Sequence, residues 1–278
     1  MTSKTLYVSD LDGTLLNRQK QVTKYTADTI NQCVKRGMHF TVATARMPYG
    51  CDYRLGDIRI NTPGILTNGV FLYDFQTEKI IAAEEIPAQS AETVVDIFQK
   101  NGLSCFVYTY GPQGISICYG HKKLEEQTQY YSDRAIEKCA QVELTENLKG
   151  AAGSGKAVYI TYTGEKKLLE PVCRDLERVE GIAYSFYLNV YNGLYCLEVF
   201  SQKASKRNAL LKLKEMTGCS ELVVFGDNLN DISMIEIADR SYAPENALHE
   251  VKEMVTQVLA DCDHDGVARF LAEEWEIK

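Results

Sequence analysis

The stretch Leu6–Thr14, with the sequence LYVSDLDGT, is a short apolar run that ends in two carboxylates, Asp10 and Asp12. Residues two apart in a strand point to the same side, and like charges at that spacing repel each other at a buried strand end. A divalent cation relieves this repulsion, and Mg²⁺ binds through one or two carboxylates together with waters and phosphate oxygens. Gly13 permits a sharp turn directly after the two carboxylates. The stretch therefore predicts a strand that presents a nucleophile, Asp10, and a general acid/base, Asp12, although the motif alone also fits an Asx-type turn after an edge strand.

The next segment indicates a parallel sheet. Thr23 is placed to cap a helix that ends at Gly37, and the β-prone run Met38–Arg46 follows directly. A helix between two largely apolar strands is typical of a βαβ crossover, and ligands of such sheets bind beyond the carboxyl ends of the strands. Asp10 and Thr44 both fall at such ends.

From about Glu84 onward the pattern of predicted helices and strands changes. It predicts helices and strands of an α+β domain, at 88–100, 103–110, 115–119, 121–148 (helical and more polar), 157–162, 182–188 and 194–200. We therefore predict an α/β protein in which a parallel-sheet domain of residues 1–83 and 201–278 carries an inserted α+β domain of residues 84–200.

After Ser201 the chain again shows the pattern of the first segment, in which apolar strands end in polar residues. Lys206 begins a predicted helix, and the buried strand 221–225 ends in the polar segment Gly226–Asp231, with the sequence GDNLND. Further helices are predicted at 245–254 and 265–275. The carboxylates of this late segment are expected at the same sheet edge as Asp10.

Together these strand ends supply the groups that phosphoryl transfer needs. Asp10 can attack phosphorus and form an aspartyl phosphate, and Asp12 can protonate the leaving oxygen and later deprotonate the attacking water. Asp10 and Asp227, with the backbone carbonyl of Asp12, are the predicted Mg²⁺ ligands.

The predicted phosphate-binding groups are hydrogen-bond donors and one cation: the backbone N–H groups of Leu11 and Ala45, the Thr44 hydroxyl, the Asn230 amide and the Lys206 ammonium. We predict that Asp231 orients Lys206 or a metal-bound water. Taken singly, each of these residues also has an ordinary structural explanation, such as a solvated lysine at a helix start. It is their combination at successive strand ends that favours a phosphoryl-transfer site.

Composition narrows the class of protein. The chain of 278 residues has 45% hydrophobic residues and a formal net charge of −8, which does not favour nucleic acid or an anionic membrane as a partner. Nine scattered cysteines without a CxxC pair indicate free thiols rather than a disulfide framework or a zinc site. Because the sequence shows no signal-peptide pattern and no apolar run of membrane-spanning length, we expect a cytoplasmic protein.

The motifs resemble those of the haloacid dehalogenase (HAD) superfamily, specifically its Cof-type sugar-phosphatase-like branch with an inserted type IIB cap. The matching segments are Asp10–Thr14, Ala43–Arg46, Thr67–Val70, Ser205–Leu210, Phe225–Asp231, Asn246–Ala247, Val251–Lys252 and Asp265–Ala268. Two residues stand where the family usually has glycine. Ala45 keeps the N–H that a phosphate would use, and Arg207 either adds positive charge near the site or faces solvent.

The resemblance implies a Rossmann-like core, Mg²⁺ dependence and a phosphatase that acts on small phosphorylated metabolites, with sugar phosphates first among them. A sugar phosphomutase of the same cap type and a low-turnover phosphate-binding regulatory protein are the alternatives. Specificity is expected from cap side chains that close over the site. The sequence does not indicate an oligomeric state.

Overall fold

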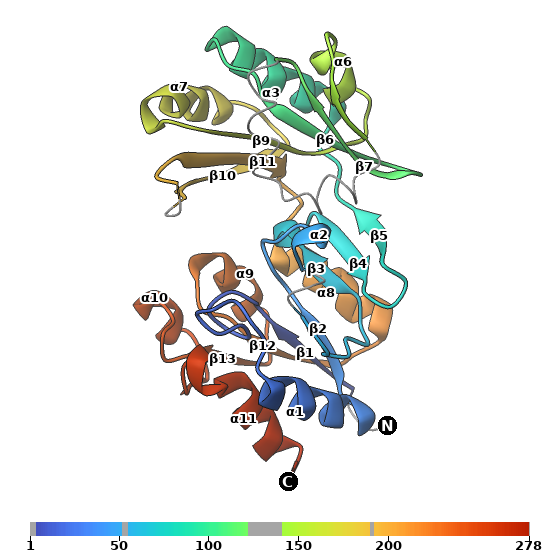
Figure 1. Cartoon of the computed structure of the whole chain (residues 1–278), viewed down its shortest axis with the longest axis vertical. Coiled ribbons are helices and arrows are strands. Elements are labelled where there is room, and N and C mark those ends of the chain that lie inside the picture. Colours follow the sequence, from blue (N-terminus) through green and yellow to red (C-terminus); the bar gives the residue numbers. More distant parts are fainter. Residues whose placement is uncertain (1–3, 52–54, 122–140, 190–191, 278) are drawn as a thin grey trace. The chain divides into compact units, whose positions relative to one another are not determined.

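The computed structural model describes residues 4–51, 55–121, 141–189 and 192–277. The chain divides into two compact units, one formed by Met1–Ala82 with Ser205–Lys278 and the other by Ala83–Ala204. Each unit is a sheet packed against helices (Figure 1). The predicted α/β fold class, a parallel-sheet core together with a second α+β unit, is confirmed.

The first unit contains a five-stranded parallel sheet in the order β14-β13-β12-β1-β2. Its strands are β1 (Thr5–Ser9), β2 (His39–Val42), β12 (Glu221–Phe225), β13 (Arg240–Pro244) and β14 (Gln257–Leu259). Ser9, the last residue of β1, lies opposite Val42 on β2 and Phe225 on β12. The carboxyl ends of β1, β2 and β12 therefore lie at one edge of the sheet.

The side of the sheet on which the chain adds its next strand changes between β1 and β12. From β1 the chain continues to β2 on one side, whereas from β12 it continues to β13 and β14 on the other. A crevice forms at such a switch point in an open α/β sheet, because the connections on the two sides lead away from each other. The loops after β1 and β12 both begin at this switch point.

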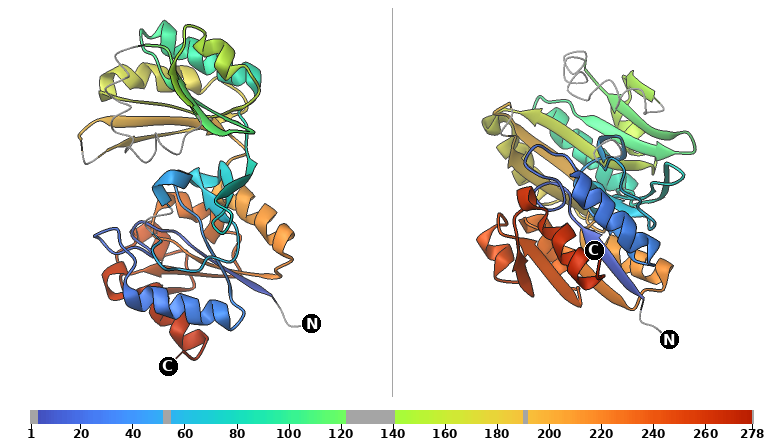
Figure 2. Two further views of the ribbon diagram at one scale, coloured as in Figure 1. Left: turned by 45° about the vertical axis from the view of Figure 1, so that its right-hand side comes forward. Right: turned by 60° about the horizontal axis from the view of Figure 1, so that its bottom comes forward.

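Helices cover both faces of this sheet because successive residues of its strands point to opposite faces. Leu6 and Val8 of β1 pack in one cluster with Leu210 of α8 (Lys206–Thr217), a cluster that α9 (Ile232–Ile235) also joins. Tyr7 points the other way and contacts the indole of Trp275, which follows α11 (Gly266–Glu274). Figure 2 shows α11 beside α1 (Lys24–Lys35), and the two helices pack together. The short elements of this unit are α2 (Pro48–Cys51), η4 (Leu229–Asp231), α10 (His249–Lys252) and η5 (Cys262–His264).

A small three-stranded sheet continues from β2. It consists of β3 (Gly64–Leu66), β4 (Phe71–Asp74) and β5 (Lys79–Ala83), with the single turn η2 (Thr67–Gly69) after β3. Ala43 forms a parallel bridge with Ile65, so this sheet holds the segment that follows β2.

The second unit has a six-stranded sheet in the order β10-β11-β9-β6-β7-β8. The strands are β6 (Phe106–Gly111), β7 (Gly114–Tyr119), β8 (Gln141–Leu144), β9 (Ala157–Gly164), β10 (Ile182–Leu188) and β11 (Tyr195–Ser201). Helices α3 (Ala88–Lys100), α6 (Leu148–Ala152) and α7 (Lys166–Leu176) lie on one face of the sheet (Figure 1). The buried core between them includes Phe98, Ile160 and Leu197.

Several elements differ from the expectation. Residues 141–144 form strand β8 instead of the predicted helix, and residues 122–140 of that prediction lie outside the described residues. Strands β13 and β14 were not expected, because one is interrupted by polar residues and the other has only three residues. The helix predicted at 245–254 is a single turn at His249–Lys252.

The eight cysteines of the described ranges are free, and seven of them are buried. Every helix within these ranges is too short or too polar to cross a lipid bilayer.

Candidate active site

Asp10 lies at the carboxyl end of β1, in the crevice described above. Its backbone N–H donates to the carbonyl of Phe225 at 2.9 Å, so the chain direction of β1 continues to this residue. The residue is 6% exposed. Burial raises the pKa of Asp10 well above its ordinary value, and the ammonium of Lys206 offsets part of that rise. A nearby cation is therefore needed to keep this carboxylate ionised.

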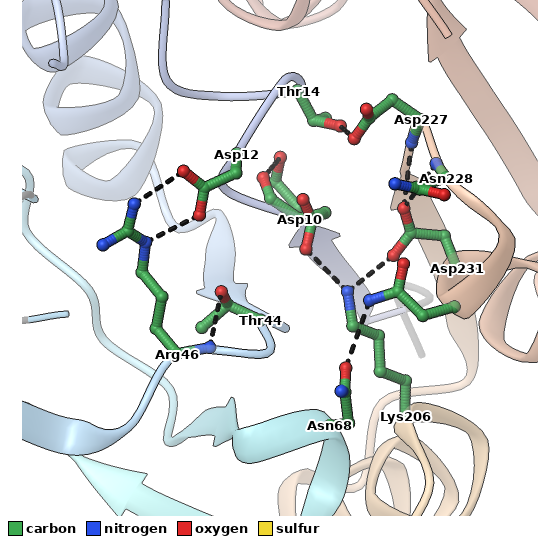
Figure 3. Close-up of polar contacts among 12 residues, drawn as sticks. Asp10, Asp12, Thr14, Thr44, Arg46, Asn68, Lys206, Asp227, Asn228 and Asp231 are labelled. Atoms are coloured by element: carbon green, nitrogen blue, oxygen red, sulfur yellow. Dashed lines mark hydrogen bonds and ion pairs between the residues drawn. The ribbon is translucent and has the colours of Figure 1, made fainter. Parts of the chain in front are cut away.

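Lys206 supplies one such positive charge. It is the first residue of α8 and 1% exposed, and its Nζ donates to Oδ1 of Asp10 and to Oδ1 of Asp231, both at 2.6 Å (Figure 3). Burial alone lowers the pKa of Lys206, but the charges of Asp10 and Asp231 outweigh burial and leave the pKa above its ordinary value. The lysine is thus held as an ammonium ion inside the crevice.

Asp231 is held on three sides. Its Oδ2 accepts hydrogen bonds from the backbone N–H groups of Asp227, at 2.9 Å, and Asn228, at 3.0 Å, while Oδ1 accepts from Lys206. The residue is fully buried. Because its oxygens already accept three hydrogen bonds, Asp231 anchors the loop after β12 and fixes the position of the Lys206 ammonium.

Asp227 faces the loop after β1 from across the crevice. Its Oδ1 accepts a hydrogen bond of 2.7 Å from the Thr14 hydroxyl. Its Oδ2 would lie only 2.5 Å from a Cβ at Gly13, where φ is +85°, so glycine is required at this approach. Burial raises the pKa of Asp227 to about 6.

Asp10, Asp227 and Asp231 form an acidic cluster whose ligand atoms lie within 4.8 Å of one another. Three carboxylates share one lysine, so a divalent cation would balance the remaining charge. Carboxylate oxygens are the donors that Mg²⁺ and Ca²⁺ prefer. The donor set therefore fits a hard divalent cation, and Asp10 and Asp227 are better placed to hold it than Asp231, whose oxygens are engaged.

Asp12 points away from this cluster. Both of its carboxylate oxygens accept hydrogen bonds of 2.6 Å from the Arg46 guanidinium, through Nε and Nη2 (Figure 3). The Asp12 side chain is 41% exposed and that of Arg46 is 18% exposed. Arg46 also donates to the carbonyl of Gly50 at 3.3 Å. Asp12 is therefore oriented by a planar, two-point contact with Arg46.

The remaining predicted residues occupy different positions around the crevice. Thr44 is 1% exposed, and its hydroxyl oxygen accepts from the backbone N–H of Arg46 at 3.2 Å, which leaves the hydroxyl proton for another acceptor. Leu11 is buried, and Ala45 is exposed. The positive-φ residues of the described chain do not include Ala45, so alanine adopts this backbone without strain.

Two predicted or flanking polar residues lie farther out. Asn230 is exposed, and its Nδ2 donates to Oδ1 of Asn68 at 3.1 Å. Arg207 is exposed and forms an ion pair with Glu236 at 3.3 Å, so it faces solvent rather than the acidic cluster.

Sequence reasoning missed several contacts that shape the site. The Thr14 bond to Asp227, the Arg46 bonds to Asp12 and the Asn68 bond to Asn230 were not expected. Asn246 donates to the carbonyl of Gly13 at 2.7 Å and so holds the turn after Asp12. The only available signal was that most of these residues belong to the motifs quoted above.

This arrangement is suited to transferring a group on which negative charge develops in the transition state. A buried carboxylate, Asp10, is paired with an ammonium, and donors such as the Thr44 hydroxyl lie at the neighbouring strand end. A preorganised cation and donors of this kind stabilise a charged transition state.

The chain is similar to several named phosphatases along nearly its whole length. The 5-amino-6-(5-phospho-D-ribitylamino)uracil phosphatase YwtE of Bacillus subtilis is 25% identical over 280 residues, covering 94% of this chain and 95% of that protein. Pyridoxal phosphate phosphatase YbhA of Escherichia coli is 24% identical, covering 98% of each.

Solved structures share the fold. A haloacid dehalogenase-like hydrolase from Bacteroides thetaiotaomicron superposes with a TM-score of 0.76 at 23% identity, covering 97% of this chain and 99% of that one. The HAD subclass IIB sugar phosphatase BT4131 superposes with a TM-score of 0.71 at 20% identity, covering 99% and 100%. The family model for haloacid dehalogenase-like hydrolases matches residues 7–271, and the chain therefore belongs to this family of hydrolases.

Proposed function

We propose that the protein is a Mg²⁺-dependent phosphatase that hydrolyses phosphomonoesters of small metabolites, with sugar phosphates first among them, through an aspartyl-phosphate intermediate. The observation that carries this proposal is the buried Asp10 carboxylate at the switch point of the sheet, paired with Lys206 at 2.6 Å inside a cluster of three carboxylates. Family membership and the printed names of the relatives support the same chemistry.

In the first step a carboxylate oxygen of Asp10 attacks phosphorus, and the bond from phosphorus to the ester oxygen breaks. Asp12, which must give up one Arg46 contact and carry a proton in this step, donates that proton to the departing oxygen, which leaves as an alcohol. Lys206 and the Thr44 hydroxyl stabilise the charge that develops on the phosphoryl oxygens. Backbone N–H groups of Leu11 and Ala45 are the further donors that we assign to this group.

In the second step water attacks the phosphorus of the aspartyl phosphate. Asp12, now ionised, accepts a proton from that water, and inorganic phosphate leaves as the Asp10 carboxylate is restored. A bound Mg²⁺, held by Asp10, Asp227 and the Asp12 carbonyl, would reduce the repulsion between the anionic nucleophile and the anionic substrate. Asp231 would keep Lys206 in place through both steps.

We propose that the inserted unit, predicted at residues 84–200, acts as a cap that selects the substrate, because it is separate from the unit that carries the acidic cluster. The relatives are named for different phosphate esters, so a search for the substrate of this protein must cover several classes of phosphate ester. Sugar phosphates come first in this search because the motifs resemble those of the sugar-phosphatase-like branch.

The test is release of inorganic phosphate from a panel of sugar phosphates, nucleotides and phosphorylated cofactors, with Mg²⁺ and with EDTA. We expect Asp10→Asn to abolish hydrolysis of p-nitrophenyl phosphate and to leave the circular-dichroism spectrum unchanged. Asp28→Asn, which removes an exposed carboxylate paired with Lys24, is the matched control and should keep full activity. Full turnover by Asp10→Asn would overturn the nucleophile assignment, and isomerisation of a sugar phosphate without phosphate release would indicate a phosphomutase.

A further inference from the structure

The turn η2, Thr67–Gly69, has an unusual backbone for its sequence. Its three successive residues have φ angles of +52°, +53° and +101°. A β-branched residue such as Thr67 is a marked outlier in this region of φ, whereas Asn68 and Gly69 tolerate it better. Strained backbone of this kind persists only where the surrounding structure imposes it, and it concentrates at functional sites.

The backbone of this turn holds the segment that follows β2. The N–H of Thr67 donates to the carbonyl of Arg46, and the N–H of Asn68 donates to the carbonyl of Thr44, both at 3.0 Å. A trans peptide is planar, so its C=O and N–H point in opposite directions. The bond from Asn68 to the Thr44 carbonyl therefore fixes the direction of the Ala45 N–H.

The same turn touches the start of α8. A Cβ at Gly69 would lie 2.3 Å from the carbonyl oxygen of Ser205 and 2.8 Å from its nitrogen, so only glycine permits this approach of two backbones. Ser205 caps α8 and directly precedes Lys206. The turn thus also limits where the Lys206 ammonium can lie.

The side chain of Asn68 completes a third contact. Its Oδ1 accepts the hydrogen bond from Nδ2 of Asn230, a residue 162 positions away in the sequence. This bond orients the Asn230 carboxamide, which would otherwise rotate freely on an exposed loop.

We propose that Thr67–Gly69 is the positioning element of the phosphate pocket, and that Asn68 acts through two neighbours, the Ala45 N–H and the Asn230 amide. This inference rests on the proposed phosphatase function. Asn68 is a positioning residue, and its effect should appear in phosphate affinity rather than in folding stability.

The test uses Asn68→Gly, because glycine keeps the left-handed backbone while removing the carboxamide. We expect the inhibition constant of inorganic phosphate to rise about tenfold and kcat/KM to fall by a similar factor, since one oriented hydrogen bond is lost. The unfolding midpoint should stay close to that of the unsubstituted protein. Glu78→Gly is the control, because Glu78 is exposed and has the same φ of +53° in the turn between β4 and β5.

A double-mutant cycle with Asn230→Ala separates positioning from a general effect. Glycine keeps the backbone N–H that bonds the Thr44 carbonyl, so Asn68→Gly leaves the Ala45 N–H in place and removes only the contact with Asn230. If the Asn68 side chain acts through Asn230, the double variant should therefore lose no more phosphate affinity than the worse single variant. Fully additive losses, or unchanged phosphate inhibition in an active Asn68→Gly enzyme, would overturn this inference and leave the proposed function standing. An unsubstituted protein that neither hydrolyses phosphate esters nor binds inorganic phosphate would overturn both.

Discussion

The guanidinium of Arg46 holds both carboxylate oxygens of Asp12 at 2.6 Å. The two residues are 34 positions apart, one following β1 and the other following β2. A two-point contact between planar groups sets the direction of the carboxylate as well as its distance. Arg46 is therefore the residue that decides where the proposed acid/base stands.

Arg46→Lys tests this relationship, because lysine keeps the charge but cannot make the planar contact. We expect kcat to fall by about 10²-fold for alkyl phosphates, whose leaving group needs a proton, and by much less for p-nitrophenyl phosphate. Asp12→Asn should show the same dependence on the leaving group. Steady-state kinetics on the two esters measure the effect, and Arg240→Lys, in an ion pair with Glu221 and Glu274, is the control. Equal losses on both esters would contradict the assignment.

Lys206→Met should destabilise the protein strongly. The substitution leaves Asp10 and Asp231 buried without their ammonium, and breaking a buried pair in this way costs about 3–5 kcal/mol. Chemical denaturation without added metal measures this loss, and added Mg²⁺ should recover part of it by replacing the missing positive charge. Lys149→Met, which breaks an exposed pair with Asp96, should change the free energy of unfolding by less than about 1 kcal/mol. If the two variants lose similar amounts of unfolding free energy, the buried Lys206 pairs stabilise the protein no more than an exposed ion pair does.

Gly13→Ala should impair the acidic cluster, because the new Cβ would lie 2.5 Å from Oδ2 of Asp227 and force that carboxylate to move. Gly37 offers a matched control, since it also has a positive φ, of +102°, but no atom lies within 4 Å of a Cβ there. Both substitutions should cost about 1 kcal/mol of backbone strain. Only Gly13→Ala should raise the Mg²⁺ concentration needed for half-maximal hydrolysis, by about tenfold or more. An unchanged Mg²⁺ dependence would exclude Asp227 as a metal ligand.

Tyr7 should make stability depend on alkaline pH. Burial, together with the nearby Glu274 carboxylate, raises the pKa of the Tyr7 phenol from 10.0 to about 12. The folded state therefore holds the phenolic proton more tightly than the unfolded state, so the stabilisation is fully present below pH 10 and is lost as pH rises towards 12. The shift corresponds to about 3 kcal/mol, which Tyr7→Phe should remove from the pH dependence of unfolding. If Tyr7→Phe and the unsubstituted protein lose stability in parallel over this range, the phenol is not responsible.

The sequence alone determined the class of fold and the neighbourhood of the site. Apolar runs before Asp10, Thr44 and Asp227 predicted β1, β2 and β12, and parallel strands bring their carboxyl ends to one edge of a sheet. Burial of their apolar side chains favours such runs as strands of a sheet, so these strands can be predicted from the local sequence. Strands β8 and β14 escaped prediction because they are short and largely exposed, and apolar patterning is the signal that they lack.

Only the tertiary structure decided which polar groups meet. Asp12 pairs with Arg46, Thr14 donates to Asp227, and Asn68 accepts from Asn230. These contacts join loops far apart in the sequence, and they depend on backbone angles at single residues, such as the positive φ at Asn68. Side chains of the same type at the same positions would remain apart if those loops turned differently, because a hydrogen bond forms only within a few tenths of an ångström and a narrow range of angles.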